Sequence, residues 1–237
     1  MAITEMILQL SGTVIIGICA VFGILFRLLA KKKVPEIVTD TDNFDSNEPE
    51  TKEVNKTKTI IYSIISFISI LTVGLVFVFA FGFDDVVYTL KRVLLVAILF
   101  VAAYYDNLEY RIPNKLILCG LGCRAVLLIF EFIFYRDAVI GNLISEGIAV
   151  AALVILSVVG LLIIRNGIGM GDIKLFILMA LCQGISGVMS SIFTTLICAF
   201  FYSVFLILTK KKSRKDFIAF APCILIGTFI SVIIFGA

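Results

Sequence analysis

The sequence predicts an all-α membrane protein, a polytopic bundle of about eight transmembrane helices. Of its 237 residues, 61% are hydrophobic and only 16% are charged, and the mean hydropathy is +1.13. The core of a soluble domain cannot bury that much apolar surface, so we expect the long apolar runs to cross a bilayer. Charged residues separate the runs and indicate where each one ends.

The composition also excludes several kinds of chemistry. The chain has no histidine, which rules out Ser–His and Cys–His catalysis and histidine metal sites. Its cysteines lie in apolar runs without a C-x-x-C pair, and we interpret them as small buried residues rather than as disulfide or zinc ligands. They are Cys19, Cys119, Cys123, Cys182, Cys198 and Cys223. We therefore predict no metal and no cofactor, and we expect no nucleic-acid partner.

The first apolar run covers residues 6–26. Glu5 precedes it, and Arg27 and three lysines at 31–33 follow it. A cleaved signal peptide has its positive charge before the apolar region, so the charge order here favours a retained span. Because basic residues favour the cytoplasmic side, we predict an N-terminal transmembrane helix over residues 1–30, with the N-terminus outside.

A polar stretch follows the first helix. Residues 34–58 contain seven acidic side chains and few aromatic ones, a composition typical of disorder. We predict that residues 31–58 form an acidic, disordered cytoplasmic linker. Residues 59–237 then form a core of seven helices.

Four spans of the core are predicted by their apolar length, at residues 59–83, 86–105, 116–135 and 138–164. The third reaches the roughly 20 residues needed to cross only if Lys91 and Arg92 extend toward the outer surface. Arg124, Glu131 and Glu146 are unusual charges inside the next two spans. We expect them to pair within the bundle or to reach the outer surface, and their role stays open.

The last part of the chain is longer than one span requires. Residues 175–209 carry no charge, and the segment 183–187 is a plausible turn near the middle. A sixth span at 172–184 and a seventh ending near 209 place the basic cluster at 210–215 inside, as the positive-inside rule favours. The eighth span is 217–236. This arrangement puts 16 of the 20 Lys and Arg residues on the cytoplasmic side.

Two short stretches carry the candidate chemistry. Residues 105–115 read YDNLEYRIPNK, and residues 167–175 read GIGMGDIKL. Each places an aspartate, Asp106 or Asp172, at the cytoplasmic end of a long apolar run. A carboxylate at a membrane boundary is costly to hold, so it indicates function by default. Because both lie on one membrane face, we expect them to act as a pair.

Two carboxyl groups that share one proton can hydrolyse an amide. One accepts a proton from the attacking water and the other donates a proton to the substrate, and the sequence does not say which is which. Gly169 and Gly171 permit a sharp turn and a close approach to another helix. Pro113 is tolerated in the first turn of the next helix, because its missing N–H is not needed there.

These residues resemble the type IV prepilin peptidase family, the membrane aspartyl proteases that process pilins and related secretion subunits. The block 105–115 resembles the family's first catalytic block, and 167–175 resembles its G-x-G-D block; the segment 220–222 resembles, more loosely, a proline-containing block. The resemblance implies that Asp106 and Asp172 are catalytic. It also places Asn114 and Lys174 near the site, shaping it together with Gly169, Gly171 and Pro113.

The resemblance further implies the substrate and the location. The substrate is a type IV prepilin or pseudopilin precursor with a short basic leader, cut at the cytoplasmic face of the bacterial inner membrane. Members that methylate the new N-terminus carry a cysteine-containing domain after the first span. The segment 30–58 has no cysteine here, so we expect leader cleavage without N-methylation and without S-adenosylmethionine. Which pilin-like protein is cut, and the oligomeric state, stay open.

Two alternatives are open at this stage. The first is an intramembrane G-x-G-D protease of the presenilin or signal peptide peptidase type, although the block at 112–114 and the inner-edge aspartates argue against it. The second is a small proton-coupled transporter that uses Asp106 and Asp172 as proton sites. That reading favours deeper carboxylates and internal repeats, and the sequence shows no repeat.

Overall fold

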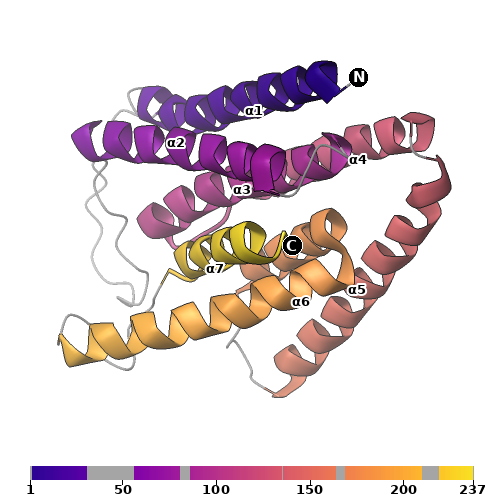
Figure 1. Cartoon of the computed structure of the whole chain (residues 1–237). Coiled ribbons are helices and arrows are strands. Elements are labelled where there is room, and N and C mark those ends of the chain that lie inside the picture. The colour runs from indigo at the N-terminus through magenta and orange to yellow at the C-terminus, as the bar shows by residue number, and fades with distance from the viewer. Residues whose placement is uncertain are drawn as a thin grey trace.

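The computed structural model describes residues 2–30, 56–80, 86–134, 136–163, 169–209 and 219–236. These residues form helices and connecting segments only, so the all-α prediction is confirmed (Figure 1). Six helices are long and apolar enough to cross a membrane, which makes the chain a polytopic helical membrane protein. The helices are α1 (Ala2–Ala30), α2 (Lys56–Ala80), α3 (Val86–Glu109), α4 (Asn114–Phe134), α5 (Arg136–Ile163), α6 (Met170–Leu208) and α7 (Ala221–Phe235).

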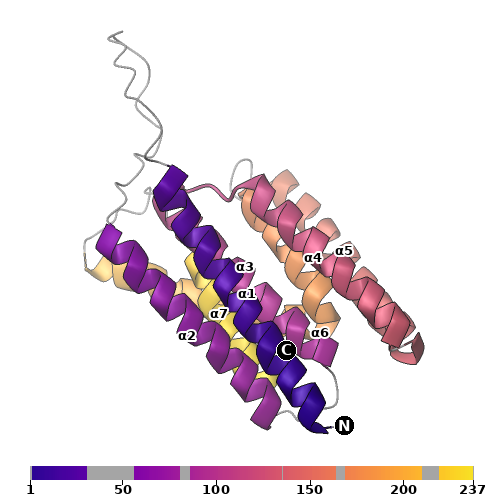
Figure 2. The same ribbon diagram turned by 90° about the horizontal axis from the view of Figure 1, so that it is seen from above.

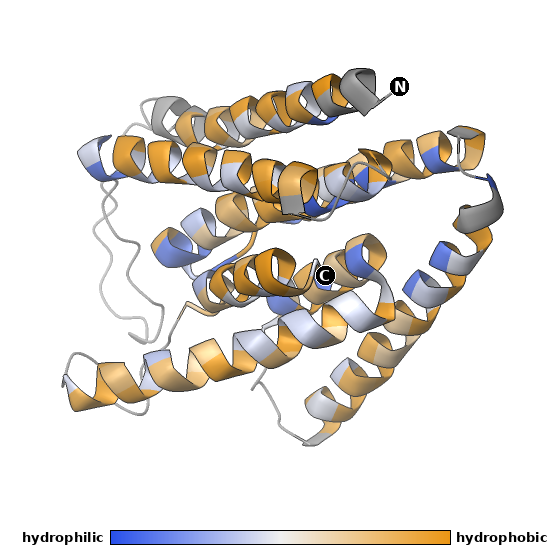
Figure 3. Cartoon of the chain, in the orientation of Figure 1, coloured by the Kyte–Doolittle hydropathy of each residue, from blue (hydrophilic) through white to orange (hydrophobic). Residues whose placement is uncertain are grey.

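The outer faces of the helices are apolar, as a lipid environment requires. Figure 3 shows hydrophobic residues covering the outside of the bundle along most of its length. Phe79 on α2 and Leu162 on α5 are 75% and 79% exposed. In water such surfaces would be costly, whereas in a bilayer they meet acyl chains of similar polarity.

Helix α3 is the centre of the bundle and the most buried of the long helices. It packs against α1, α2, α4, α6 and α7. Figure 2 shows α1, α2 and α7 grouped around it, with α4 and α5 on the other side. Its closely packed, apolar middle part, residues 93–104, is buried on all sides. Because Asp106 follows directly, the central helix carries a carboxyl group at its end.

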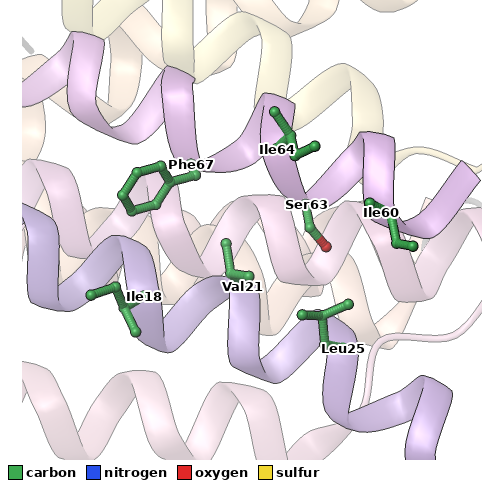
Figure 4. Close-up of a pocket in the computed structure, with 7 residues that line it drawn as sticks. All are labelled: Ile18, Val21, Leu25, Ile60, Ser63, Ile64 and Phe67. Carbon is green, nitrogen blue, oxygen red and sulfur yellow. The ribbon is translucent and has the colours of Figure 1, made fainter. Parts of the chain in front are cut away.

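A shallow apolar groove runs between α1 and α2 (Figure 4). Its volume is about 330 Å³, and its walls are almost entirely hydrophobic. The lining residues are Ile18, Val21, Leu25, Ile60, Ser63, Ile64 and Phe67.

Helix α6 is broken at Gly184, where the backbone leaves the helical region with φ 67° and ψ −171°. The chain changes direction sharply there, and the part after the break runs beside α7 (Figure 1). The break falls inside the predicted turn at 183–187. It needs a single residue rather than a loop, so the described structure has seven helices where about eight spans were predicted. The last helix is also shorter than the predicted span 217–236, with 15 residues.

Two predictions about the exposure of side chains were wrong. Lys91 and Arg92 do not extend to the outer surface, because they are 3% and 2% exposed and have partners inside the bundle. Cys19 and Cys119 are exposed, whereas we expected buried thiols, and both line an apolar pocket between α1, α3 and α4. Cys182 and Cys223 are buried as predicted.

The predicted linker lies mostly outside the described residues, which omit 31–55. Its last part is helical, since α2 begins at Lys56 rather than after residue 58. A lysine-containing first turn places positive charge at this end of α2.

Candidate active site

Asp106 lies in the last turn of α3 and is 7% exposed. Its Oδ2 accepts a hydrogen bond of 2.9 Å from the backbone N–H of Ala221, the first residue of α7. The first N–H groups of a helix have no partner within the helix, and together they attract negative charge. Pro222 follows and has no N–H to offer. The carboxyl group of Asp106 therefore joins the end of the central helix to the start of the last one.

Helix α3 ends within four residues of Asp106. The carbonyl of Asp106 accepts a 2.9 Å hydrogen bond from the N–H of Tyr110. Tyr110 has φ 52°, the left-handed conformation that commonly follows a helix. The chain then turns through residues 111–113 into α4, and Pro113 accepts a 3.0 Å bond from the N–H of Leu116. Pro113 therefore lies immediately before α4, one position earlier than its predicted place in the first turn.

Asp172 lies in the first turn of α6. The carbonyl of Gly169 accepts hydrogen bonds from the N–H groups of Asp172 (3.0 Å) and Ile173 (3.2 Å), which starts the helix. The carboxyl group lies against Gly169, because a Cβ on that glycine would be 2.9 Å from Oδ2 of Asp172. With φ −68°, Gly169 has an ordinary backbone conformation, and its missing side chain leaves room for the carboxyl group of Asp172.

The structure brings the two sequence blocks into contact. A Cβ on Gly171 would lie 3.2 Å from Cβ of Ile112, so the absence of a side chain lets α6 approach the turn before α4. On the exposed side, Lys174 Nζ donates a 2.8 Å hydrogen bond to Oδ1 of Asn114. Contacts of Gly171 with Ile112 and of Lys174 with Asn114 thus connect the two blocks.

The two carboxyl groups lie close enough for the charge of Asp106 to act on Asp172. Both are at least partly buried, and each is at a helix end at the same end of the bundle. In such a place, two neighbouring carboxylates repel each other strongly, and a shared proton relieves the repulsion. The arrangement can supply one proton acceptor and one proton donor to a bound amide.

Sequence reasoning gave too little weight to the segment 220–222. The N–H of Ala221 holds the carboxyl group of Asp106, and Phe220 packs edge-on against Phe176 of α6 with ring centroids 6.3 Å apart. The start of α7 therefore contacts both helices that carry the aspartates. The available indication was Pro222 near the start of an apolar run, which favours a helix N-terminus and its free N–H groups.

The bond between Lys174 and Asn114 gives a first test. It is exposed, so we expect Lys174→Met and Asn114→Ala each to change the stability by less than about 1 kcal/mol. We expect each to lower the cleavage rate about 3- to 10-fold, because the bond aligns the two blocks. The double variant should be no slower than the slower single variant, as measured by initial rates. Losses that multiply would show that the two side chains act independently.

A comparison with protein families matches residues 93–208 to the type IV leader peptidase family. The matched segment contains both aspartates, the turn into α4 and the whole of α6. No curated protein and no solved structure shows significant similarity to the chain.

Proposed function

We propose, from the type IV leader peptidase domain that residues 93–208 form, that this chain cuts prepilin-like precursors with Asp106 and Asp172. Members of this family are aspartic-type prepilin peptidases, and leader cleavage is their function. The chain is therefore a membrane-bound peptidase by its domain. The identity of the catalytic residues, the membrane orientation and the missing methylation are our proposals.

The observation that supports the site assignment is that Asp106 ends α3 and is bonded to the start of α7, while Asp172 lies in the first turn of α6, near enough for the charge of Asp106 to act on it. In the proposed reaction, one carboxylate accepts a proton from a water molecule while the oxygen of that water attacks the scissile carbonyl carbon. The other carboxyl group donates its proton to the leaving nitrogen as the C–N bond breaks. The products are a carboxylic acid on the leader and a free amine on the mature protein. Atoms and charge balance without a metal or a cofactor.

The location of the site supports a cytoplasmic cut. Asp106 is at the end of α3 and Asp172 at the start of α6, and helix ends support a position near a membrane boundary rather than at mid-depth. Positive residues Arg111, Lys115 and Lys174 are in or next to the two blocks, and such residues favour the cytoplasmic side. A short leader that precedes a hydrophobic helix reaches this boundary while its helix stays in the bilayer.

The break in α6 supports the finer topology that we propose. If each half of α6 enters the membrane separately, the chain has eight membrane segments and the N-terminus is outside. Residues 1–30 then form the first span, 31–58 a cytoplasmic linker and 59–237 the peptidase core. The two ends of α6, at Gly169 and at residue 209, lie on the same cytoplasmic side in this arrangement.

Co-expression with a pilin-like precursor from the same genome tests the function. We expect a shift from precursor to mature protein on a gel, and an intact mass that equals the mature sequence with an unmodified N-terminus. A mass higher by one methyl group would overturn the proposal that methylation is absent. Failure to cut prepilin and pseudopilin precursors alike would overturn leader cleavage and favour the transporter alternative.

A further inference from the structure

Five charged side chains are buried together at a distance from the two aspartates. Lys91 and Arg92 come from α3, Arg124 and Glu131 from α4, and Glu146 from α5, and each is 2–3% exposed. We call these five residues the buried charge cluster. Asp106 is 14 residues beyond Arg92 on α3, which is about 21 Å along a helix. The cluster therefore lies outside the proposed active site, and leader cleavage gives it no task.

Four of these side chains form closely spaced ion pairs. Arg124 Nη2 contacts both carboxylate oxygens of Glu146 at 2.7 Å and Glu131 at 3.2 Å. Lys91 Nζ contacts Glu131 at 2.7 Å and Glu146 at 3.3 Å. With Arg92 included, three positive charges meet two negative ones. A buried excess of positive charge is costly unless negative partial charge lies near the arginines.

The negative partial charge comes from the broken end of α6. Arg124 Nε donates a 2.7 Å hydrogen bond to the carbonyl of Leu181, and Arg92 Nη1 donates to the carbonyl of Cys182. Arg92 Nη2 also approaches the carbonyl of Gln183 at 3.5 Å. The last carbonyls of a helix have no partner within the helix and carry its negative end. Two arginines therefore cap the half-helix that ends at the break.

The other side of the break is capped as well. The N–H of Ile185 would bond to the carbonyl of Leu181 in an uninterrupted helix. It instead donates a 3.1 Å hydrogen bond to Oγ of Ser145 on α5, while Arg124 takes the carbonyl of Leu181. The carbonyls of Leu181 and Cys182 and the N–H of Ile185 thus have side-chain partners from three different helices. Such pairing of buried backbone groups is expected where a helix break is a regular part of the fold.

We propose that the buried charge cluster and Ser145 hold the break in α6 and thereby position Asp172, so that Arg92 and Arg124 are positioning residues for the peptidase reaction. The inference rests on the proposed catalytic role of Asp172. The half-helix from Met170 to the break acts as a rigid rod, fixed at one end by the arginines and carrying Asp172 near the other.

The lever arm makes the position of Asp172 sensitive to the break. Asp172 is 12 residues from Gly184, about 18 Å along the helix at 1.5 Å per residue. A tilt of about 3° at the break therefore moves Asp172 by about 1 Å. A displacement of that size in a catalytic group lowers a rate by about 100-fold. Loss of one capping arginine is thus expected to act on catalysis at a distance.

The test combines backbone hydrogen exchange with cleavage kinetics on the full chain in nanodiscs. Arg124→Gln removes the bond to Leu181, and the uncharged Ser145→Ala removes the acceptor for Ile185 if the first variant folds poorly. Ile70→Ala on α2 is the control for lost packing elsewhere. We expect faster exchange at residues 181–187 in the first two variants only. We expect kcat to fall about 10- to 100-fold in Arg124→Gln and about 3-fold in Ser145→Ala, with KM within 2-fold.

The possible outcomes test two claims separately: that the side chains hold the break, and that the break positions Asp172. Hydrogen exchange at residues 181–187 that matches the wild type in Arg124→Gln and Ser145→Ala would overturn the proposal that these side chains hold the break. Faster exchange with a kcat no lower than that of Ile70→Ala at equal thermal stability would overturn the positioning of Asp172. A wild-type chain that cuts no leader would overturn the proposed function. The exchange data would still decide whether the buried charge cluster and Ser145 hold the break.

Discussion

Asp106→Asn and Asp172→Asn are each expected to lower the rate of leader cleavage by about 100- to 10,000-fold, the range that general acid–base groups contribute. Asparagine has nearly the same shape but neither accepts nor donates a proton at a carboxyl oxygen. At position 106 its amide oxygen can still accept the hydrogen bond from Ala221 N–H, so we expect the fold to be retained. The measurement is the single-turnover cleavage rate, with thermal unfolding of each variant in parallel.

The choice of asparagine rather than alanine matters at Asp106. Asp106→Ala would leave the N–H of Ala221 buried without its acceptor, at a cost of about 1–3 kcal/mol. A slow alanine variant would therefore not distinguish lost chemistry from a displaced α7. Glu109→Gln is a matched control, since it makes the same chemical change one turn from Asp106, and it should keep at least half of the wild-type rate. Aspartate variants as fast as this control would rule out the acid–base pair.

The sequence predicted the placement of the two aspartates from local features. Each follows or begins a long apolar run, and the charges beside the runs favour one membrane face. The structure puts both at helix ends at one end of the bundle, and Gly171 packs against Ile112 as a close approach requires. Their catalytic role stays a prediction. The hydrogen bond from Ala221 to Asp106 could not be predicted, because a backbone N–H has no signature of its own.

Charge counting failed at Lys91 and Arg92 for a physical reason. Counting charges along one predicted span treats each charged side chain as exposed either to lipid or to water. On that basis, extending Lys91 and Arg92 toward the outer surface had the lowest free-energy cost. The partners of Lys91 are carboxylates on α4 and α5, which are 40 and 55 residues later in the chain. A pairing of that range depends on how helices pack. The same limit applies to Arg124, whose pairing within the bundle was one of two outcomes that we left open.

The break in α6 is at Gly184, inside the turn that we predicted at residues 183–187. Charge balance required the uncharged run 175–209 to turn back, and its small polar residues marked the place. What the sequence could not specify is that one glycine makes the whole turn. That depends on Arg92, Arg124 and Ser145 taking the freed backbone groups, and these residues come from other helices.

Gly184→Ala is expected to destabilise the protein by about 2–4 kcal/mol. The backbone at Gly184, with φ 67° and ψ −171°, is in a region that essentially only glycine adopts. A Cβ there would also lie 2.8 Å from Oγ of Ser145, the group that accepts the N–H of Ile185. Both effects act on the turn that fixes the half-helix carrying Asp172. The measurement is the free energy of unfolding in detergent, with the cleavage rate measured below the unfolding range.

Gly122→Ala is the matched control for this prediction. Gly122 is inside α4, and a Cβ there would meet no atom within 4 Å. Alanine forms helices better than glycine by up to about 1 kcal/mol, so this variant should be as stable as the wild type or slightly more stable. In Gly184→Ala/Ser145→Ala the close contact is relieved, but the backbone strain stays and the N–H of Ile185 loses its acceptor, so the double variant should stay less stable than the wild type. If Gly184→Ala were as stable and as active as Gly122→Ala, α6 would not need its break, and the single-glycine turn would be the wrong description of this membrane segment.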